Sequence, residues 1–519
     1  MDINDIIVLD IIDTNENGVG IAKKDNAVIF VNGAVKGDTA EVKILSHEKN
    51  YYTAEITRLI SLSDYRIKPE CGSFYICGGC TLGNVSYEYE NIIKKNTVIS
   101  AFRRAGIDYS IVENTVYSQN RANYRNNISL HFDGEKFVYY ASKTNDSVVF
   151  GECLLSPKSF YAVVDYANSH VQSLIKYHPR EIHVRNNHKG DITLSVYTET
   201  AVDKDSADNM RADLQKEFAK NSDITYNVAF ICDNHGSSYI YDEIHGLKMR
   251  YSSEAFRQVN TETFEMLLDI VLSFASKCTF DFGADLYCGS GIIGLTIAEK
   301  MPQKNFIGIE INPDSINDAK YNAAWNGIGN IKYFVGDSSS LYKRVNSDAL
   351  PEFVIVDPPR AGLSKSLCND LVKINPSNII YVSCNPQTLA RDLKFLTQNG
   401  YKAEHAVPVN LFPFTKHVET VCLLSKQKPD DIIRIGLDLS ELDITVSEKK
   451  ATYGEIQSYV LEHSGLKVSH LYIAQVKQKY GIIERENYNK PKSEDSKQPQ
   501  CPPEKEAAIA EALKYFKMI

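Results

Sequence analysis

Apolar and polar residues alternate along the first part of this chain in a way that predicts short strands. Residues 27–31 and 52–56 are examples, and strands of this kind recur among less regular segments up to about residue 250. From residue 261 to residue 275 the apolar positions recur at helical spacing, and strand and helix patterns then alternate up to about residue 425. This alternation is typical of a doubly wound parallel sheet with helices on both faces.

The pattern divides the chain into four predicted domains, because 519 residues are too many for one hydrophobic core. We predict a small OB-like β-barrel at residues 1–62, a mixed α+β central domain at 63–250, a Rossmann-like α/β domain at 251–428 and a helical extension at 429–519. In the extension, predicted helices over 453–462 and 469–480 flank a glycine turn. Such a pair fits a plain packing module at least as well as a helix-turn-helix unit.

Composition narrows the class of protein. A hydrophobic content of 43% and a charged content of 24% are ordinary for a globular protein. The acidic first residues lack the basic and apolar regions of a signal peptide, and no apolar run is long enough to cross a bilayer. We therefore expect a cytoplasmic protein with no membrane partner, and we expect a monomer.

The net charge of −9 by itself disfavours a nucleic-acid partner. Phosphate binding, however, needs a local basic face and not a basic total. Candidates for such a face are the basic residues that lie close together in the sequence, namely Lys94, Lys95, Arg103, Arg104, Arg121 and Arg125. Composition therefore leaves a nucleic-acid partner open.

A glycine-rich turn indicates a nucleotide cofactor. Tyr287 and Cys288 end a predicted strand, and Gly289 and Gly291 follow it directly before a helix. Glycines let the backbone approach a ligand closely, and the start of the helix offers unpaired N–H donors. About 20 residues further on, Glu310 closes the next strand, where its carboxylate can accept both ribose hydroxyls. These features fit NAD and S-adenosylmethionine equally well.

Two later strand ends favour S-adenosylmethionine. Asp337 follows one strand, where it could accept a hydrogen bond from the amine of adenine or simply cap a loop. Asp357 follows the next strand and begins the segment Asp357-Pro358-Pro359-Arg360. A rigid Pro-Pro turn fixes the carboxylate and the backbone carbonyls where they can bind a planar polar ring. Methyltransferases that act on bases need such a loop, whereas dehydrogenases do not.

Cys384 is the candidate nucleophile. It lies in Ser383-Cys384-Asn385-Pro386 at the end of a predicted buried strand, which is where parallel α/β sheets place reactive groups. A lone cysteine of this kind is more often a small buried hydrophobe. Here, however, the glycine turn and the Asp357 loop precede it and a carboxylate, Glu419, follows it in His417-Val418-Glu419.

A second group of cysteines indicates a metal site. The chain has 11 cysteines and no export signal, which argues against a disulfide framework. Cys71, Cys77 and Cys80 lie on one glycine-containing segment, and Cys153 is a plausible fourth ligand. Four cysteines bind zinc or a [4Fe–4S] cluster, and their spacing does not separate the two strongly.

With these motifs in hand, the chain resembles the RNA (uracil-5-)-methyltransferase family, and within it the branch that acts on 23S rRNA and carries a TRAM domain and an iron–sulfur cluster. The resemblance covers about residues 1 to 425. Its most specific marks are residues 357–363, Ser383–Pro386 and 412–420, and residues 18–22 with Gly37-Asp38 carry the likeness to a TRAM barrel. It implies that the four cysteines hold a [4Fe–4S] cluster.

The resemblance also implies roles for single residues. Uracil C5 is a poor nucleophile, so a thiolate must add to C6 before C5 can take a methyl group, and Cys384 matches that thiolate. Glu419 matches the base that later removes the C5 proton, and Asp357 matches a residue that positions uracil and cofactor. Phe256 matches an aromatic residue that fills the stack vacated by the flipped base. The cofactor contacts implied in this way are Gln258, Tyr287, Gly289, Gly291, Glu310, Asp337 and Asp357.

Some residues depart from the family, and other functions stay open. Ile292, Arg257 and Phe414 replace residues more usual in relatives, and Ile292 puts one polar cofactor contact in doubt. Methylation of the adenine amine also uses a Pro-Pro loop, but there an aromatic residue normally stands where this chain has Arg360. The remaining alternatives are the same C5 chemistry on tRNA and a non-catalytic RNA-binding or assembly role. Relatives that act on tRNA usually lack both the TRAM segment and the cysteine loop, which favours 23S rRNA.

Overall fold

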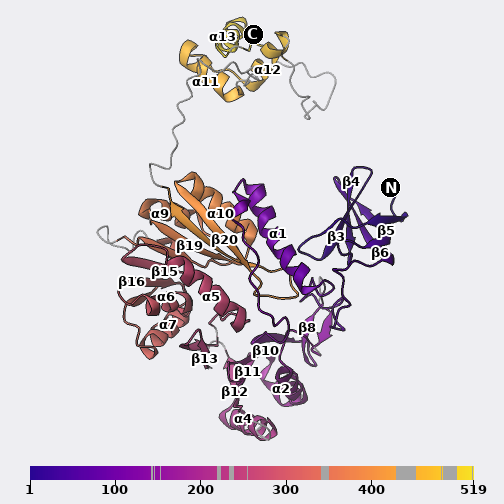
Figure 1. Ribbon diagram of the computed structural model, residues 1–519, viewed down its shortest axis with the longest axis vertical. Coiled ribbons are helices and arrows are strands. Elements are labelled where there is room, and N and C mark those ends of the chain that lie inside the picture. Colours follow the sequence, from indigo (N-terminus) through magenta and orange to yellow (C-terminus); the bar gives the residue numbers. More distant parts are fainter. Residues whose placement is uncertain are drawn as a thin grey trace. The chain divides into compact units, whose positions relative to one another are not determined.

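The computed structural model describes residues 1–141, 144, 146–151, 153–218, 224–232, 239–253, 255–340, 350–427, 452–480, 482, 500–516 and 518–519. The chain separates into two compact units, one up to residue 432 and one from residue 433. Figure 1 shows the sheets of the first unit and the helices of the second. The polar, Pro-containing composition of residues 484–503 predicts a linker, of which residues 484–499 lie outside the described residues.

The first unit begins with a six-stranded sheet in the order β1-β5-β6-β4-β3-β2. Its strands are β1 (Ile6–Asp10), β2 (Asp13–Thr14), β3 (Val19–Lys24), β4 (Ala27–Asn32), β5 (Thr39–His47) and β6 (Tyr51–Ser61). Alternate residues such as Ile29, Val31, Val42 and Ile44 point into a shared apolar core. The strands predicted for the first 60 residues are therefore confirmed.

A long helix, α1 (Tyr87–Ala105), leads to a second six-stranded sheet in the order β12-β11-β10-β7-β8-β9. The strands are β7 (Asn127–Phe132), β8 (Phe137–Tyr140), β9 (Ser147–Val149), β10 (Pro179–Asn186), β11 (Ile192–Thr198) and β12 (Tyr226–Cys232). The helices that accompany them are α2 (Lys158–Ser169), α3 (Val171–Leu174) and α4 (Lys204–Phe218). A hairpin of β13 (Tyr239–Ile244) and β14 (Leu247–Ser252) then leads to the third sheet.

The third sheet has seven strands in the order β17-β16-β15-β18-β19-β21-β20. They are β15 (Phe282–Leu286), β16 (Asn305–Glu310), β17 (Ile331–Val335), β18 (Phe353–Val356), β19 (Asn378–Ser383), β20 (Tyr401–Val409) and β21 (Glu419–Lys426). The helices between them are α5 (Thr261–Ala275), α6 (Ile292–Lys300), α7 (Pro313–Trp325), α9 (Lys365–Ile374) and α10 (Pro386–Gln398). The predicted helix at 261–275 and the α/β alternation are confirmed.

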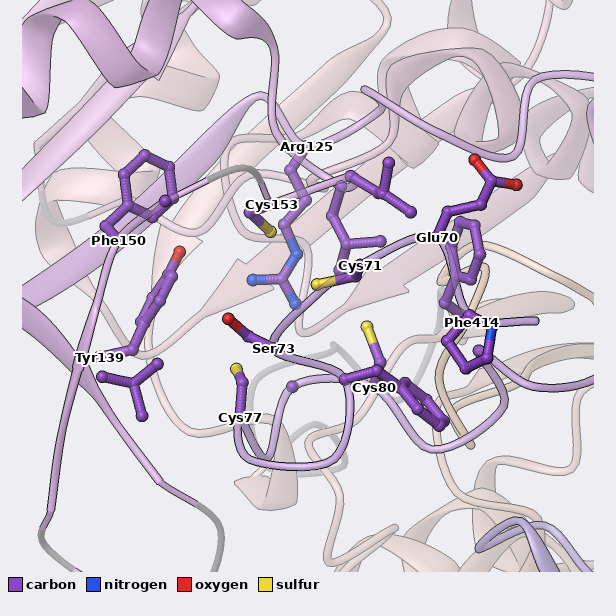
Figure 2. Close-up of a pocket in the computed structure, with 18 of the residues that line it drawn as sticks. Glu70, Cys71, Ser73, Cys77, Cys80, Arg125, Tyr139, Phe150, Cys153 and Phe414 are labelled. Carbon is purple, nitrogen blue, oxygen red and sulfur yellow. The ribbon is translucent and has the colours of Figure 1, made fainter. Parts of the chain in front are cut away.

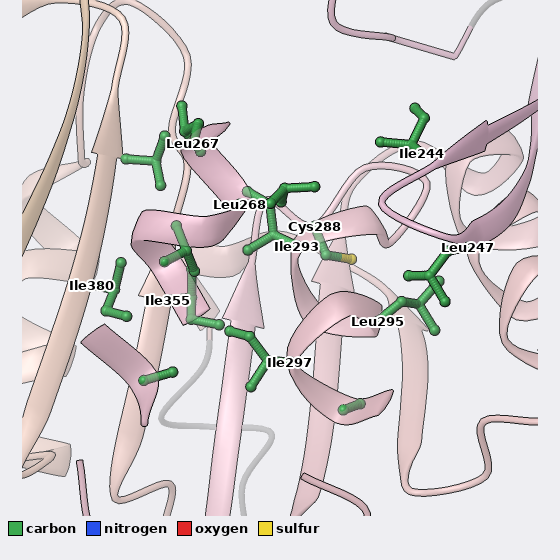
Figure 3. Packing of buried hydrophobic residues seen from close by; sticks show 14 of the residues in the cluster. Ile244, Leu247, Leu267, Leu268, Cys288, Ile293, Leu295, Ile297, Ile355 and Ile380 are labelled. Atoms are coloured by element: carbon green, nitrogen blue, oxygen red, sulfur yellow. The ribbon is translucent and has the colours of Figure 1, made fainter. Parts of the chain in front are cut away.

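Two apolar clusters pack against the third sheet. One of them joins Leu267 and Leu268 of α5 to Ile355 and Ile380 of the central strands, as Figure 3 shows. The other includes Val354, Val356 and Tyr381, the neighbours of these residues along the same strands. Because successive strand residues point to opposite faces, both faces of the sheet are buried, as a doubly wound sheet requires.

The prediction of a fully parallel sheet is wrong at one strand. β21 runs antiparallel to both of its neighbours, β19 and β20, whereas β15 to β19 are parallel. The short connection from Val409 to Glu419 explains the reversal, because it turns the chain straight back with no helical crossover. As a result, β21 begins at the edge of the sheet where the parallel strands end.

The second unit contains three described helices, α11 (Tyr453–Ser464), α12 (His470–Lys479) and α13 (Pro503–Tyr515). A capping box formed by Thr452 and Glu455 begins α11, and Gly465 ends it with a φ of 70°, in the left-handed region that favours glycine. The three helices share an apolar core that contains Ile456, Ile473 and Leu513. The helices predicted here are confirmed. No helix among the described residues is long and apolar enough to cross a membrane.

A buried ionic network joins α1 to the segment that precedes β21. Glu90 pairs with Lys94 at 3.0 Å and with Arg121 at 2.9 Å, and it also accepts the backbone N–H of Phe414. Lys94 donates to the Asn410 side chain and to the Phe412 carbonyl. Burial lowers the pKa of Lys94, while the Glu90 carboxylate raises it. This network holds residues 410–414 in place ahead of Glu419.

The network corrects part of the predicted basic face. Lys94 is only 1% exposed, and Arg121 and Lys94 share the Glu90 carboxylate. Arg125 lines an internal cavity together with the four candidate metal-binding cysteines. Lys94, Arg121 and Arg125 are therefore engaged inside the protein. A phosphate-binding face would have to use the other three candidates, Lys95, Arg103 and Arg104.

Replacing Lys94 by methionine should destabilise the first unit by about 3–5 kcal/mol, because it leaves the Glu90 carboxylate buried with one partner fewer. Chemical denaturation followed by circular dichroism measures the loss. Lys95→Met is the matched control, because Lys95 is a neighbour whose ammonium group bonds to Asn114 near the surface. Equal stability of the two variants would show that the network contributes little.

Candidate active site

The topology brings Asp357, Cys384 and Glu419 to one edge of the third sheet. Asp357 directly follows β18, and Cys384 directly follows β19. Val356 pairs with Tyr381, which places Asp357 beside Val382, two residues before Cys384. Ser383 pairs with Thr420, which places Cys384 beside Glu419. Glu419 is the first residue of β21 and stands beside Cys384 only because that strand is reversed.

Burial raises the pKa of all three groups, and repulsion adds to the shifts of Cys384 and Glu419. Burial and then the Asp357 carboxylate raise the pKa of Glu419 to about 8, although the Arg360 guanidinium opposes the shift. Burial alone raises the pKa of Asp357 to about 7. The pKa of the Cys384 thiol is raised to about 11 by burial and by Glu419 and Asp357, while Arg360 opposes this shift. These electrostatic effects show that the three groups and Arg360 share one site.

A clamp ties the loop after Asp357 to the helix after Cys384. Asp392 of α10 accepts the backbone N–H of Leu363 and the hydroxyl of Tyr381, both at 2.8 Å. Arg391 pairs with Asp392 and donates to the carbonyls of Ala361 and Leu363. The clamp fixes the positions of β18 and β19 at the ends that carry the carboxylate and the thiol.

The backbone of Arg360 is held from the same helix. The side chains of Asn385 and Thr388 both donate to the Arg360 carbonyl, at 3.1 and 3.2 Å. The guanidinium of Arg360 lies 3.2 Å from the ring nitrogens of His417. Burial and the nearby cations, Arg360 first, lower the pKa of His417 to about 4, so its imidazole is neutral at pH 7 and accepts from Arg360. Arg360 is thereby directed at the edge that holds Cys384.

The residues of the glycine turn lie next along the same edge. Tyr287 follows β15 with a φ of 63°, a left-handed conformation that is unusual for a tyrosine. Gly289 and Gly291 also have positive φ, and a Cβ on Gly291 would lie 2.5 Å from the Tyr333 hydroxyl. Space beyond Gly289 is open, since a Cβ there would meet nothing within 4 Å. The turn therefore offers bare backbone to a ligand.

Glu310 closes β16 and braces the glycine turn. Its carboxylate accepts the N–H of Gly289 at 3.3 Å and the N–H of Asn312 at 2.9 Å. Asp337 follows β17, is exposed, and accepts the N–H of Ser339 at 2.8 Å, so it caps its loop as the simpler of the two interpretations predicted. Both carboxylates lie at strand ends on the edge that carries Tyr287 and Gly289.

Phe256 and Gln258 lie apart from that edge in sequence, in the segment before α5. Phe256 is 72% exposed, which is unusual for a phenylalanine. Asn126 holds the segment by bonding to the carbonyls of Gln258 and Val259. The Gln258 Oε1 atom is buried and has no hydrogen-bond partner among the described residues. No hydrogen bond within the described chain joins these two residues to Cys384 or Glu419.

Cys71, Cys77, Cys80 and Cys153 line one cavity of about 160 Å³, together with Arg125, Tyr139 and Phe414. Figure 2 shows the four sulfur atoms and the Arg125 guanidinium directed into it. Burial and then Cys153 raise the pKa of the Cys80 thiol to about 12, whereas Arg125 lowers it. Within the described residues no three His, Cys, Asp or Glu side chains are placed to bind a single metal ion. The cysteines therefore meet as predicted, but around a cavity and not around one point.

Sequence reasoning missed the residues that position the site. Arg391, Asp392 and Thr388 were visible in the stretch after Pro386, but no local pattern assigns a partner to them. The contact between Phe414 and the cysteine cavity joins residues more than 300 positions apart. Only the fold reveals such contacts.

Comparison with known proteins identifies the family. Residues 239–427 match the family model of tRNA (uracil-5-)-methyltransferases. An uncharacterized RNA methyltransferase of Bacillus cereus is 31% identical over 448 residues, which cover 80% of this chain and 95% of that protein. The chain belongs to this family of RNA methyltransferases. A second RNA methyltransferase, from Clostridium acetobutylicum, is 32% identical over 441 residues, with 80% and 95% coverage.

This RNA methyltransferase also shares its fold with a solved structure. The crystal structure of a Pyrococcus abyssi tRNA (uracil-54, C5)-methyltransferase with S-adenosyl-L-homocysteine matches it with a TM-score of 0.61 and 22% identity. The match covers 81% of this chain and all of the other chain. At this identity the likeness shows the α/β fold alone.

Glu419→Gln should stabilise the methyltransferase, and more strongly at pH 9 than at pH 5. Burial raises the carboxyl pKa from 4.5 to about 8, so the folded protein keeps a proton that the unfolded chain loses. The resulting stabilisation is complete below pH 4.5 and is lost as the pH rises through 8, on the order of 1.4 kcal/mol per pKa unit. Glutamine has no proton to lose.

Thermal melting at both pH values measures this difference. Glu299→Gln, at an exposed glutamate on α6, is the matched control and should melt with the wild type. A gain for Glu419→Gln that is the same at pH 5 and pH 9 would contradict the assigned shift.

Proposed function

We propose that the protein transfers a methyl group from S-adenosylmethionine to C5 of a uridine in 23S rRNA. The observation that carries this proposal is the strand order and register that set a thiol, Cys384, between the half-buried carboxyl group of Asp357 and the buried one of Glu419. Addition of a thiol to a pyrimidine ring, followed by removal of a ring proton, needs a nucleophile and a base in one site. Adenine amine methylation needs no thiol, so the site favours uracil.

The reaction proceeds through a covalent adduct. The Cys384 thiolate forms a bond to uracil C6, and the electron pair of the C5–C6 double bond moves onto C5 and O4. S-adenosylmethionine supplies the methyl group that C5 then captures. The Glu419 carboxylate takes the proton from C5, the double bond re-forms, and the C6–S bond breaks to release the thiolate. Asp357, with a pKa of about 7, can hold the uracil edge as a hydrogen-bond donor or acceptor.

Arg360 favours ionisation of the Cys384 thiol, which burial opposes. With a pKa near 11, little of the Cys384 thiol is ionised at pH 7. The Arg360 guanidinium favours the thiolate, and the Pro358-Pro359 turn and the clamp from α10 hold it nearby. Uracil binding excludes water from the site and strengthens this attraction.

The cofactor fits the glycine turn. Bare backbone at Gly289 and Gly291 would receive it, Glu310 would bind its ribose hydroxyls, and Asp337 its adenine. Tyr287 would line the same edge through its left-handed backbone. The unpaired Gln258 Oε1 atom is an acceptor without a donor in the described chain, as expected of a residue that meets a ligand. Phe256, exposed before α5, would occupy the stack left by the flipped uridine.

Replacing the target uridines by 5-fluorouridine should trap the adduct. Fluorine cannot leave C5 as a proton does, so the C6–S bond persists, and denaturing gels should show a protein–RNA band that Cys384→Ala abolishes. With normal RNA, Glu419→Gln should accumulate the same band. In the wild type, the single-turnover release rate should rise with pH and level off above about pH 8, as Glu419 ionises. A Cys384→Ala protein that methylates at the wild-type rate would refute the mechanism.

The RNA substrate is tested with two transcripts in the same assay. A tRNA is the second candidate, because both the family model and the solved neighbour are named for tRNA enzymes. We favour 23S rRNA because the chain carries an N-terminal six-stranded sheet resembling a TRAM domain and the cysteine cavity. Unmodified 23S rRNA should form 5-methyluridine, detected by mass spectrometry, while tRNA should not. The reverse result would assign the enzyme to tRNA.

We also propose that Cys71, Cys77, Cys80 and Cys153 hold a [4Fe–4S] cluster. Four thiols line one cavity of about 160 Å³, and the resemblance to the iron–sulfur branch of the family favours a cluster over zinc. Methyl transfer needs no electron, so the cluster would serve the structure of the cysteine loop or its contact with RNA. Arg125 in the wall would offset its negative charge.

Protein purified without oxygen should contain about four iron and four sulfide per chain and absorb visible light. Cys77→Ala should lose the iron, whereas Cys232→Ala, outside the cavity, should keep it. One zinc per chain without visible absorption would show that the four cysteines bind zinc and not a cluster.

A further inference from the structure

A second cavity, which the proposed reaction does not use, lies in the wall that supports Phe256. It has a volume of about 390 Å³, within the range of about 300–1,000 Å³ typical of small-ligand pockets. Six of its lining residues carry carboxamides, namely Asn120, Asn123, Asn126, Asn186, Asn187 and Asn260. Carboxamides can donate and accept hydrogen bonds but bear no charge.

Four lining residues leave buried polar atoms unpaired. The Oδ1 atoms of Asn126 and Asn186 and the Nε atoms of Arg125 and Arg257 have no hydrogen-bond partner in the described chain. The Asn126 amide is fixed, because its Nδ2 donates to the Gln258 carbonyl and the Thr261 hydroxyl, so Oδ1 must be the acceptor. Asn126 is 7% exposed and Arg257 6%, and an unpaired group so deeply buried is costly. A ligand with both donors and acceptors would satisfy them.

The charges around the cavity disfavour an anion. Arg257 is already paired with Asp242 at 2.5 Å, and another nitrogen of the same guanidinium donates to the Asn186 carbonyl. Glu262 adds a carboxylate to the wall, held by Ser118 and Asn120. Arg125 also lines this cavity, but its guanidinium is directed into the cysteine cavity, so a phosphate here would face the Glu262 carboxylate and a neutralised Arg257. The lining fits a neutral, planar, hydrogen-bonding ligand, and carboxamides are the side chains that pair with base edges.

We propose that this cavity, the asparagine pocket, binds an unpaired nucleobase next to the target uridine. Its wall is continuous with the substrate segment, because Asn126 bonds to the carbonyls of both Gln258 and Val259, two and three residues after Phe256. Single-stranded RNA is read by splaying bases into such pockets and bonding their edges. Phe256 fills the stack that the target uridine leaves, and an unpaired base beside that uridine enters the asparagine pocket. This inference rests on the proposed uridine methylation.

Abasic nucleotides test the pocket. After the modified uridine is mapped, each of the three nucleotides on either side is made abasic in a synthetic RNA fragment that the wild type methylates. At one position the loss of the base should lower kcat/KM about ten-fold or more, the effect of one well-made base contact. Ala122→Leu, which fills the pocket, should lower kcat/KM on the intact RNA by a similar factor and cause no further loss on that abasic RNA.

Two carboxamide variants sharpen the test. Asn123→Gly removes one carboxamide at a residue whose φ of 57° glycine adopts freely, so it should fold normally and lose part of the same effect. Asn186→Leu should raise the melting temperature by removing an unpaired atom, yet weaken methylation of intact RNA. Asn227→Leu, at an exposed asparagine on β12 of the same sheet, is the matched control and should change neither.

The outcomes separate this inference from the proposed function. If intact RNA gains no 5-methyluridine and forms no adduct with the wild type, the proposed function fails. If methylation is normal but no abasic position lowers kcat/KM, the pocket binds only water. The same conclusion follows if Ala122→Leu and the abasic nucleotide lower kcat/KM independently, so that the two fold-changes multiply in combination. A loss at one position that Ala122→Leu and Asn123→Gly both remove supports a base in the pocket.

Discussion

The reversal of β21 is the constraint on which the site depends. In a fully parallel sheet, the first residue of the last strand would lie at the opposite edge from Asp357 and Cys384. Turning one strand around places Glu419 beside them, with its register fixed by the pair Ser383 and Thr420. This geometry adds to the effect of burial at the site, because Asp357 raises the pKa of Cys384 and Glu419, and Glu419 raises that of Cys384.

Two networks keep this crowded edge in order. The Arg391–Asp392 pair ties the two parallel strand ends together, and the Glu90–Lys94 pair anchors the segment that turns the chain into β21. The Glu90–Lys94 pair is buried, whereas in the other pair Asp392 is buried and Arg391 is exposed. Buried ion pairs often add little net stability but penalise alternative arrangements strongly. Here they hold the polar segments 361–363 and 410–414 in one conformation by hydrogen bonds and ion pairs.

Much of the fold was predictable from the sequence, and so were the members of the site. Strand and helix periodicity located the first sheet, helix α5 and the α/β alternation, because local patterns report local structure. The motifs around Cys384, Asp357 and Glu419 marked residues that the sheet edge brings together. The direction of β21 was missed, although the short connection before it leaves no room for a helical crossover and so indicates a reversal. The burial of Lys94 and Arg121 was missed because the carboxylate that pairs with them is chosen by packing and not by spacing.

Phe414 connects parts of the molecule that are usually considered separately. Its carbonyl accepts the N–H groups of Thr81 and Leu82, the residues just after Cys80, at 3.0 and 2.9 Å. Its ring lies under the Arg121 guanidinium and in the wall of the cysteine cavity. The polypeptide then needs only five more residues to reach Glu419. Oxidation of the cavity thiols would therefore have a distant effect. If the cysteine loop moved, Phe414 would lose the two hydrogen bonds from Thr81 and Leu82, and the segment that leads to Glu419 would be held less firmly.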